Sequence, residues 1–240
     1  MKRICLWSGP RNVSTALMYA FAQRSDTTVV DEPLYGAYLS LTGLPHPGAQ
    51  VVVDNMQNDA SKVIKEVFLG DYETEAVFIK SMAHHLFGLP SDFLDHMENV
   101  ILTRDPEEML PSLINQIPEP ELRDTALPAQ IELLQRDLDA GKKPIVLDAR
   151  ELLLDPGGVL TQLCNILDVD FLDHMLHWEA GPKSYDGVWA PFWYHNVHRS
   201  TGFAEYKRKE DPFPDRLRPL LEQTAPMYDQ LYAYALRASN

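Results

Sequence analysis

The chain has few cysteines, few basic residues and no long hydrophobic run. Its only two cysteines among 240 residues, Cys5 and Cys164, both lie in apolar segments. They indicate buried thiols in a reducing compartment rather than a disulfide framework. No apolar stretch approaches the roughly 20 residues that a membrane-spanning helix needs, and the apolar run at 4–7 is too short for a secretion signal. We therefore expect a soluble, cytoplasmic protein with no membrane partner.

Basic residues are also outnumbered. The chain has 21 lysines and arginines against 35 acidic residues, which gives a formal net charge of −14. This balance repels polyanions, so we expect no nucleic-acid partner. A phosphorylated small molecule is compatible with the charge only where bases gather in a pocket. With 45% hydrophobic residues the chain can build a core, and its length fits one generous domain.

Short apolar runs alternate with helical patterns along most of the chain. The predicted strands are 3–7, 27–30, 76–79, 99–103 and 144–147, and the predicted helices are 14–24, 56–69 and 157–167. Strands separated by helices form right-handed crossovers and a parallel sheet covered on both faces. We therefore predict a three-layer α/β/α domain with a central parallel sheet of about five strands.

The last third of the chain is rich in aromatic residues. Segment 181–202 contains Tyr185, Trp189, Trp193 and Tyr194, and a helical pattern returns at 215–237. We predict a single domain over residues 1–240, with this region forming a cover from about residue 178. Its aromatic side chains either contact a ligand or belong to the core of the cover, and we favour the core for at least one of them.

Ligands of parallel sheets bind at the carboxyl ends of the strands. At three of the five predicted strand ends a basic residue lies at the end or a few residues beyond it, namely Arg11, Lys80 and Arg104. This is the local concentration of positive charge that a phosphorylated ligand would require. We expect the walls of the pocket to come from segments such as 34–60 and 115–135, and the composition of these segments does not indicate a particular substrate.

The first strand leads through a turn at 8–13 into a helix. Free backbone N–H groups and the helix dipole favour an anion there, and the hydroxyls of Ser14 and Thr15 can add hydrogen bonds. Arg11 would supply a two-pronged charge for phosphate or sulfate. A nucleotide P-loop would have Gly-Lys where the chain has Ser14-Thr15. The alternative is an ordinary turn in which Ser14 caps the helix.

A second candidate follows the fourth strand. Arg104 stands at the strand end and Ser112 lies eight residues later, so a guanidinium and a hydroxyl could grip a second phosphate. Pro106 suits the first turn of a helix, whereas Pro111 should kink or shorten it. The alternative is a surface pair of Arg104 with Asp105 or Glu108, which would contribute little.

In their order, spacing and strand context, these motifs resemble those of sulfotransferases that use 3′-phosphoadenosine 5′-phosphosulfate (PAPS). In that family the first turn reads roughly Pro-Lys/Arg-Ser-Gly-Thr-Thr/Ser, and Pro10-Arg11-Asn12-Val13-Ser14-Thr15 stands in its place. Arg104 and Ser112 keep the interval of the family's 3′-phosphate motif. Segment 145–156 is similar to the family's late strand and acidic-Leu turn. The likeness spans about residues 3–170, and Lys183 lies where the family has a basic loop that closes over the nucleotide.

The resemblance implies a P-loop NTPase-like fold and transfer of a sulfuryl group from PAPS to a hydroxyl or amine of a small-molecule acceptor. It implies no requirement for a metal. The 10–15 turn would hold the 5′-phosphosulfate, with Arg11 stabilising the leaving phosphate. Arg104 and Ser112 would hold the 3′-phosphate, and Lys183 would help to close the pocket. Val13 departs from the family's glycine, and a β-branched residue resists a left-handed backbone.

The base that removes the acceptor's proton has several candidates. Some branches of the family carry a catalytic glutamate after the second strand, where this chain has Glu32. Other branches carry a histidine just beyond a lysine of the third strand. Here Lys80 is followed by His84 and His85, while the familiar position is Met82. We favour Glu32 over either histidine and place Lys80 in the same catalytic group.

Two other functions fit the residues. The strand that ends in Asp148 is typical of a magnesium-dependent P-loop kinase or NTPase, although the Gly-Lys-Ser/Thr turn is missing. Val13 and the displaced histidines are compatible with a nucleotide-binding module that has lost catalysis.

Overall fold

The central sheet is parallel throughout. The computed structural model describes residues 1–208 and 211–239, and its five strands lie in the order β2-β3-β1-β4-β5. The strands are β1 (Lys2–Ser8), β2 (Thr27–Asp31), β3 (Ala76–Met82), β4 (Glu98–Thr103) and β5 (Ile145–Asp148). All five predicted strands are present, so the predicted sheet is confirmed. Within the predicted cover, residues 209–210 and 240 lie outside the described residues.

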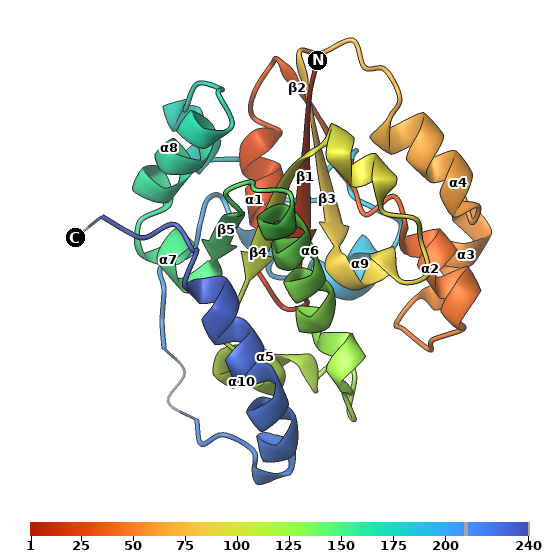
Figure 1. Ribbon diagram of the computed structural model, residues 1–240, viewed down its shortest axis with the longest axis vertical. Helices are drawn as coiled ribbons and strands as arrows, with labels where there is room; N and C mark the ends of the chain where they lie inside the picture. Colours follow the sequence, from red (N-terminus) through yellow and green to blue (C-terminus); the bar gives the residue numbers. More distant parts are fainter. Residues whose placement is uncertain (209–210, 240) are drawn as a thin grey trace.

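Helices connect the strands and surround the sheet (Figure 1). They are α1 (Ser14–Phe21), α2 (Tyr35–Thr42), α3 (Ala49–Asn55), α4 (Ala60–Val63), α5 (Pro106–Leu113), α6 (Leu127–Asp139), α7 (Ala149–Leu154), α8 (Pro156–Ile166), α9 (Ala190–Trp193) and α10 (Arg218–Tyr232). The helix predicted at 56–69 is only the short α4 followed by a π-helical turn at Ile64–Phe68. Asp59 caps α4 by accepting from Ser61 and Lys62, which sets its start later than predicted.

Side chains of β1 alternate between two apolar cores. Ile4 and Leu6 belong to the core that α1 and α8 cover, whereas Cys5 and Trp7 belong to the core that α6 and α10 cover. Figure 1 shows α6 and α10 in front of the sheet. This alternation is the period of a strand buried on both faces. It confirms the predicted three layers.

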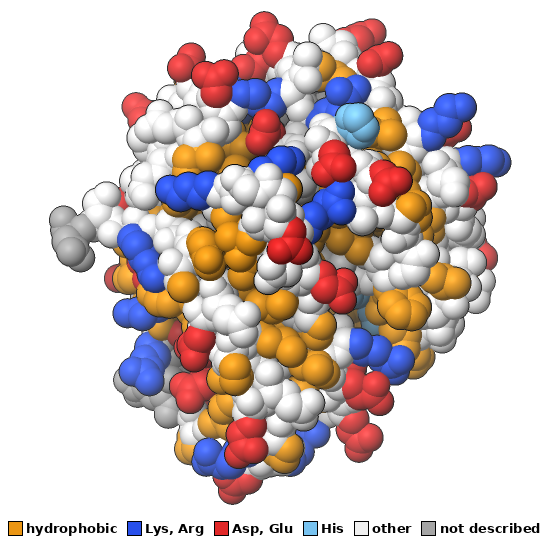
Figure 2. All heavy atoms as spheres, viewed as in Figure 1, with side chains coloured by type: hydrophobic (Ala, Val, Ile, Leu, Met, Phe, Trp, Pro, Cys, Tyr) orange, Lys and Arg blue, Asp and Glu red, His pale blue; other side chains and the backbone are white. Residues whose placement is uncertain are grey.

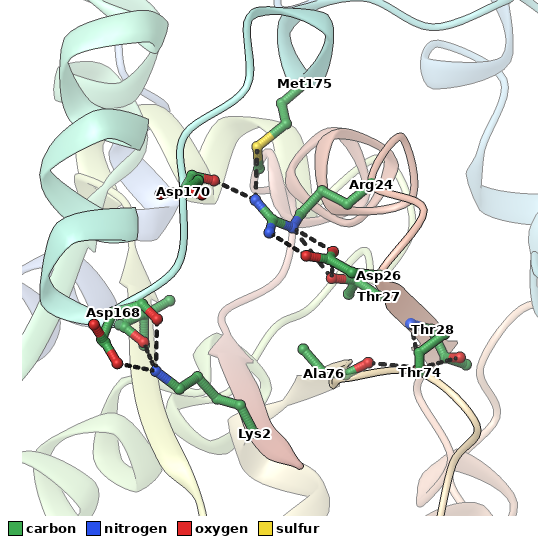
Figure 3. A network of polar contacts seen from close by, with 11 residues as sticks. Lys2, Arg24, Asp26, Thr27, Thr28, Thr74, Ala76, Asp168, Asp170 and Met175 are labelled. Carbon is green, nitrogen blue, oxygen red and sulfur yellow. Dashed lines mark hydrogen bonds and ion pairs between the residues drawn. The ribbon is translucent and has the colours of Figure 1, made fainter.

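The amino-terminal edge of the sheet is closed by polar contacts (Figure 3). Lys2 donates to the main-chain oxygens of Leu167 and Asp168, the latter at 2.9 Å. Arg24 donates through Nη2 to Asp26 at 2.7 Å and through Nη1 to the oxygen of Asp170. These contacts hold the loops around that edge, opposite the edge at which a ligand would bind.

The outer surface carries mixed charge. On the face in Figure 2, lysines and arginines are scattered among acidic side chains rather than gathered in one patch. None of the helices within residues 1–208 and 211–239 combines the length and the hydrophobicity that a membrane span requires.

The central position of β1 makes Leu6 a test of the core. Leu6 is fully buried, so Leu6→Ala leaves a cavity and should lower the free energy of unfolding by about 3 kcal/mol. Urea denaturation measures this change. Leu154→Ala, at a side chain 50% exposed, is the control and should change stability by less than about 0.5 kcal/mol. Equal effects of the two substitutions would contradict the two-core arrangement.

Candidate active site

A cavity of about 480 Å³ opens at the carboxyl ends of β1, β3 and β4. It brings together nearly all the site residues predicted from the sequence. Those that line it are Pro10, Arg11, Asn12, Val13, Ser14, Thr15, Glu32, Lys80, His84, His85, Arg104 and Ser112. Lys183 is not among the lining residues. Its ammonium donates to the main-chain oxygen of Glu179 at 2.6 Å and lies 6.0 Å from the ring of Tyr19.

The turn between β1 and α1 presents free backbone donors to the cavity. The first helical hydrogen bond runs from the N–H of Leu17 to the oxygen of Val13 at 3.0 Å. The N–H groups of residues 14–16 precede that bond and have no helical carbonyl to reach. Ser14 is not the cap, because α1 begins there after Val13 and has no side-chain cap. This start of α1 can hold an anion.

Asn12 fixes the shape of the turn. Its Nδ2 donates to the oxygen of Leu102 in β4 at 3.0 Å, and its Oδ1 accepts from the N–H of Val13 at 2.9 Å. The turn is thereby tied to the strand that leads to Arg104. The sequence identified Asn12 only by its place in the motif, and the structure shows that its side chain ties the turn to β4.

The left-handed backbone of the turn falls on Arg11, not on Val13. Arg11 has a φ of 53°, whereas Val13 has a φ of −93°, which a β-branched residue adopts without strain. The expected conflict between Val13 and the backbone is therefore wrong for this turn. Arg104 supports the strained residue by donating through Nη1 to the oxygen of Arg11 at 2.7 Å.

Arg11, Arg104 and Ser112 meet on one wall of the cavity. The Nε of Arg11 donates to the hydroxyl of Ser112 at 3.0 Å. Burial and the nearby charge of Arg104 lower the pKa of Arg11. Two guanidinium groups this close repel each other, so an anion between them would be favoured. Helix α5 is short and ends at Leu113, in agreement with the shortening expected from Pro111. Ser112 therefore lies in its last turn.

Arg104 also makes the pair that was expected as the alternative. Its Nη2 lies 3.2 Å from Oε2 of Glu108, and Glu108 in turn accepts from the hydroxyl of Tyr206. The Nε of Arg104 is buried and contacts no hydrogen-bond partner among the described residues. A guanidinium with one unused donor at a cavity wall is equipped to take a further acceptor.

A buried ionic cluster forms the opposite wall. Lys80 is 1% exposed, and its Nζ donates to Asp31 at 3.0 Å, to the hydroxyl of Tyr194 at 2.6 Å and to Glu32. Asp31 and Lys80 are direct partners in the register of β2 and β3. Burial alone would lower the pKa of Lys80, but the two carboxylates outweigh it and raise that pKa. The ammonium therefore stays charged.

Glu32 combines a strained backbone with a carboxylate held by Lys80. Its φ is 39°, and its N–H donates to the oxygen of Lys80 at 2.7 Å. Burial raises the pKa of Glu32 more than the charge of Lys80 lowers it. Its Oε1 accepts from the ammonium of Lys80, and Glu32 lines the cavity. A carboxylate held in this way can accept a proton from a ligand in the cavity.

The two histidines lie in the wall as neutral rings. His85 is 2% exposed and stacks on Tyr35 with ring centres 4.9 Å apart. Neither of its ring nitrogens has a partner among the described residues. Burial lowers the pKa of His85 well below its ordinary value and lowers that of His84 to about 3. Both are uncharged at neutral pH.

Several cavity residues could not be identified from motifs. Tyr35 and His46 come from the segment 34–60, and Ile117 and Asp124 come from the segment 115–135. The sequence indicated these segments as walls but gave no signal for the individual side chains. Trp189, Trp193 and Tyr194 of the cover also line the cavity, although Trp189 and Tyr194 are at the same time buried core residues.

Asp148 serves as a helix cap. Its Oδ1 accepts from the N–H groups of Arg150 and Glu151 at 2.9 and 3.1 Å, and its Oδ2 accepts from the hydroxyl of Tyr228 at 3.1 Å. It does not line the cavity, and both of its oxygens are already occupied. The residue that motivated a magnesium-dependent kinase therefore has a structural explanation.

With this geometry in view, known proteins can be compared. The sulfotransferase domain family matches residues 1–235, and the chain belongs to it. Two Arabidopsis thaliana proteins, named branched-chain-amino-acid aminotransferase-like proteins 1 and 2, are 40% and 38% identical over 98% and 100% of this chain. The chain spans only 42% and 43% of their lengths.

Solved sulfotransferase structures share the fold. A sulfotransferase from Alicyclobacillus acidocaldarius aligns with a TM-score of 0.56 at 14% identity, over 100% of this chain and 98% of that one. The sulfotransferase domain from the curacin biosynthetic pathway aligns with a TM-score of 0.54 at 16% identity, over 94% and 98%. The α/β fold expected from the resemblance is thus confirmed.

Asp148 makes stability depend on pH in a specific direction. Burial raises its pKa from 3.8 to about 6. Between these values the folded carboxyl keeps a proton that the unfolded chain has lost, so the free energy of unfolding falls as pH rises. Relative to Asp148→Asn, the unsubstituted protein should lose roughly 3 kcal/mol between about pH 4 and pH 6, as measured by urea denaturation.

Asp59→Asn, at the cap of α4, is the control for that experiment, because Asp59 is exposed. Its pH profile should follow that of the unsubstituted protein. Parallel profiles for Asp148→Asn and the unsubstituted protein would contradict the assigned effect of burial.

Proposed function

We propose that this protein transfers a sulfuryl group from PAPS to a hydroxyl or amine of a small-molecule acceptor. One observation carries the proposal. In a chain with a net charge of −14, Arg11 and Arg104 face a single cavity together with Ser112 and the free start of α1. A donor with anionic groups at both ends would meet both clusters.

The donor would bind across these two clusters. The turn 10–15, with Arg11, Ser14 and Thr15, would hold the 5′-phosphosulfate. Arg104 and Ser112 would hold the 3′-phosphate, using the unpartnered Nε of Arg104. Lys183 stays outside this arrangement in the structure, and its proposed part would require the loop that carries it to approach the cavity.

Glu32 is the proposed base. The acceptor oxygen would bond to sulfur while the bond from sulfur to the bridging phosphate oxygen breaks, and the acceptor's proton would pass to Glu32. Arg11 would stabilise the charge that develops on the leaving phosphate. Lys80 would position Glu32 through Oε1 and leave Oε2 to face the acceptor. His84 and His85 remain the competing bases, since both line the cavity as neutral rings.

Removal of the Arg104 guanidinium tests the donor site. Arg104→Ala should weaken binding of the desulfated nucleotide PAP by at least tenfold, because a charge-assisted hydrogen bond to phosphate is lost. Titration calorimetry measures this change. Arg136→Ala removes an arginine that pairs with Asp95 outside the cavity, and it should leave PAP affinity unchanged. Unaltered PAP binding in Arg104→Ala would show that the 3′-phosphate assignment is wrong.

The choice of base is tested by Glu32→Gln. Glutamine keeps the shape and can still accept from Lys80, but it cannot take a proton at neutral pH. The transfer rate from PAPS should fall about a hundredfold or more while PAP affinity stays the same. A fall with His85→Asn but not with Glu32→Gln would move the role to the histidine. Tight PAP binding without transfer to any of a broad panel of acceptors would favour an inactive nucleotide-binding module.

A further inference from the structure

Beyond the arginines, the cavity is walled by aromatic rings held at fixed angles. Tyr35 meets Trp189 edge to face, with ring centres 5.3 Å apart and planes at 87°. Tyr35 is held by a 3.1 Å contact between its hydroxyl and Nδ1 of His46. Trp193 also lines the cavity and donates from Nε1 to the oxygen of Pro47 at 3.3 Å. Tyr35 and Trp189 are almost fully buried, so the partly exposed ring of Trp193 is the face that could bind an organic cation.

Two acidic residues, Glu32 and Asp124, line the cavity together with Lys80. Asp124 lies near the aromatic wall, because its charge acts on His46, whose Nδ1 contacts Tyr35. The ammonium of Lys80 is already bound by two carboxylates and a hydroxyl. The arginines of the lining cluster with Ser112 at the other wall. A positively charged ligand would therefore be attracted here, and an anionic one repelled.

Asp124 has one oxygen to spare. Its Oδ2 accepts from the N–H of Glu121 at 2.7 Å, which caps a short 3₁₀ helix. Its Oδ1 lies 3.9 Å from Nε of Arg123, whose side chain is 62% exposed. The charge of Asp124 also reaches His46: burial lowers the pKa of His46, and Asp124 partly raises it. The carboxylate of Asp124 therefore lines the cavity, and its cationic neighbour Arg123 is distant and exposed.

We propose that the acceptor is an alcohol that carries an alkylammonium group. The cation would lie against the partly exposed ring of Trp193, beside the buried pair of Tyr35 and Trp189, with Asp124 as counter-charge and the hydroxyl pointing to Glu32. An uncharged acceptor would leave the buried carboxylate of Asp124 with only the exposed side chain of Arg123, 3.9 Å away, as its counter-charge. The inference rests on the proposed function for the reaction, but the cation site itself can be tested by binding alone.

The test compares choline with its uncharged isostere, in which carbon replaces the quaternary nitrogen. Titration calorimetry is done on the full chain, with and without saturating PAP. Choline should bind about tenfold more tightly than the isostere, because a desolvated cation gains from the aromatic faces and the carboxylate. Equal affinities, or tighter binding of the isostere, would overturn the proposal.

Asp124→Asn separates charge from structure, because asparagine can still accept from the N–H of Glu121. The preference for choline should fall to about twofold or less, while the affinity of the isostere stays the same. Asp59→Asn makes the same substitution at an exposed helix cap and should keep the full preference. An equal loss for both ligands in Asp124→Asn would indicate a structural role only and would overturn the proposal.

Trp193→Leu is the second variant and should also reduce the preference for choline, even if Asp124→Asn does not fold. The two proposals fail differently. If PAP does not bind, the sulfuryl-transfer function is wrong, while the choline preference measured without PAP still decides the cation site. If PAP binds and choline shows no preference, only the acceptor class is wrong.

Discussion

The buried charge of Lys80 is the constraint on which the rest of the site depends. An ammonium that is 1% exposed is tolerated only when acceptors surround it, and here Asp31, Glu32 and Tyr194 do so. Asp31 and Glu32 come from the end of β2, whereas Tyr194 comes from the cover. Asp31 also accepts from the N–H of Gly187, again in the cover. The same charge therefore fixes the candidate base and docks the C-terminal region onto the sheet.

Backbone strain marks the two walls of the cavity. Four non-glycine residues among those described have a positive φ, and two of them, Arg11 and Glu32, line the cavity. A hydrogen bond holds the backbone of each residue. Nη1 of Arg104 donates to the main-chain oxygen of Arg11, and the N–H of Glu32 donates to the main-chain oxygen of Lys80. Strain of this kind persists where the surroundings over-determine the conformation. It aims a guanidinium and a carboxylate into one space from opposite sides.

Much of this arrangement follows from the sequence because parallel strands end at one edge. The basic residues Arg11, Lys80 and Arg104 each follow a buried apolar run, so the sequence predicts that they lie close together at one edge of the sheet. The positions of Asp124 and His46 were not predictable, because Asp124 lies in a short 3₁₀ helix and His46 in a loop, and no short-range pattern sets where either segment runs. The pairing of Lys80 with Asp31 could be recognised only once the register of β2 and β3 was known. The role of Asp148 as a cap likewise depends on where α7 begins. Local patterns thus located the edge, and tertiary geometry selected the contacts.

The contact of Arg104 with Glu108 has a consequence for the proposed binding of a phosphate. Glu108 pairs with the guanidinium of Arg104 and is itself held by Tyr206, which lies in the segment that leads to α10. A phosphate arriving at Arg104 would have to share or replace this internal counter-ion. Under the proposed function, a phosphate would therefore exchange with the carboxylate of Glu108 at Arg104. In the proposed reaction, such an exchange would weaken the binding of the desulfated nucleotide and leave Arg104 with a counter-ion after release.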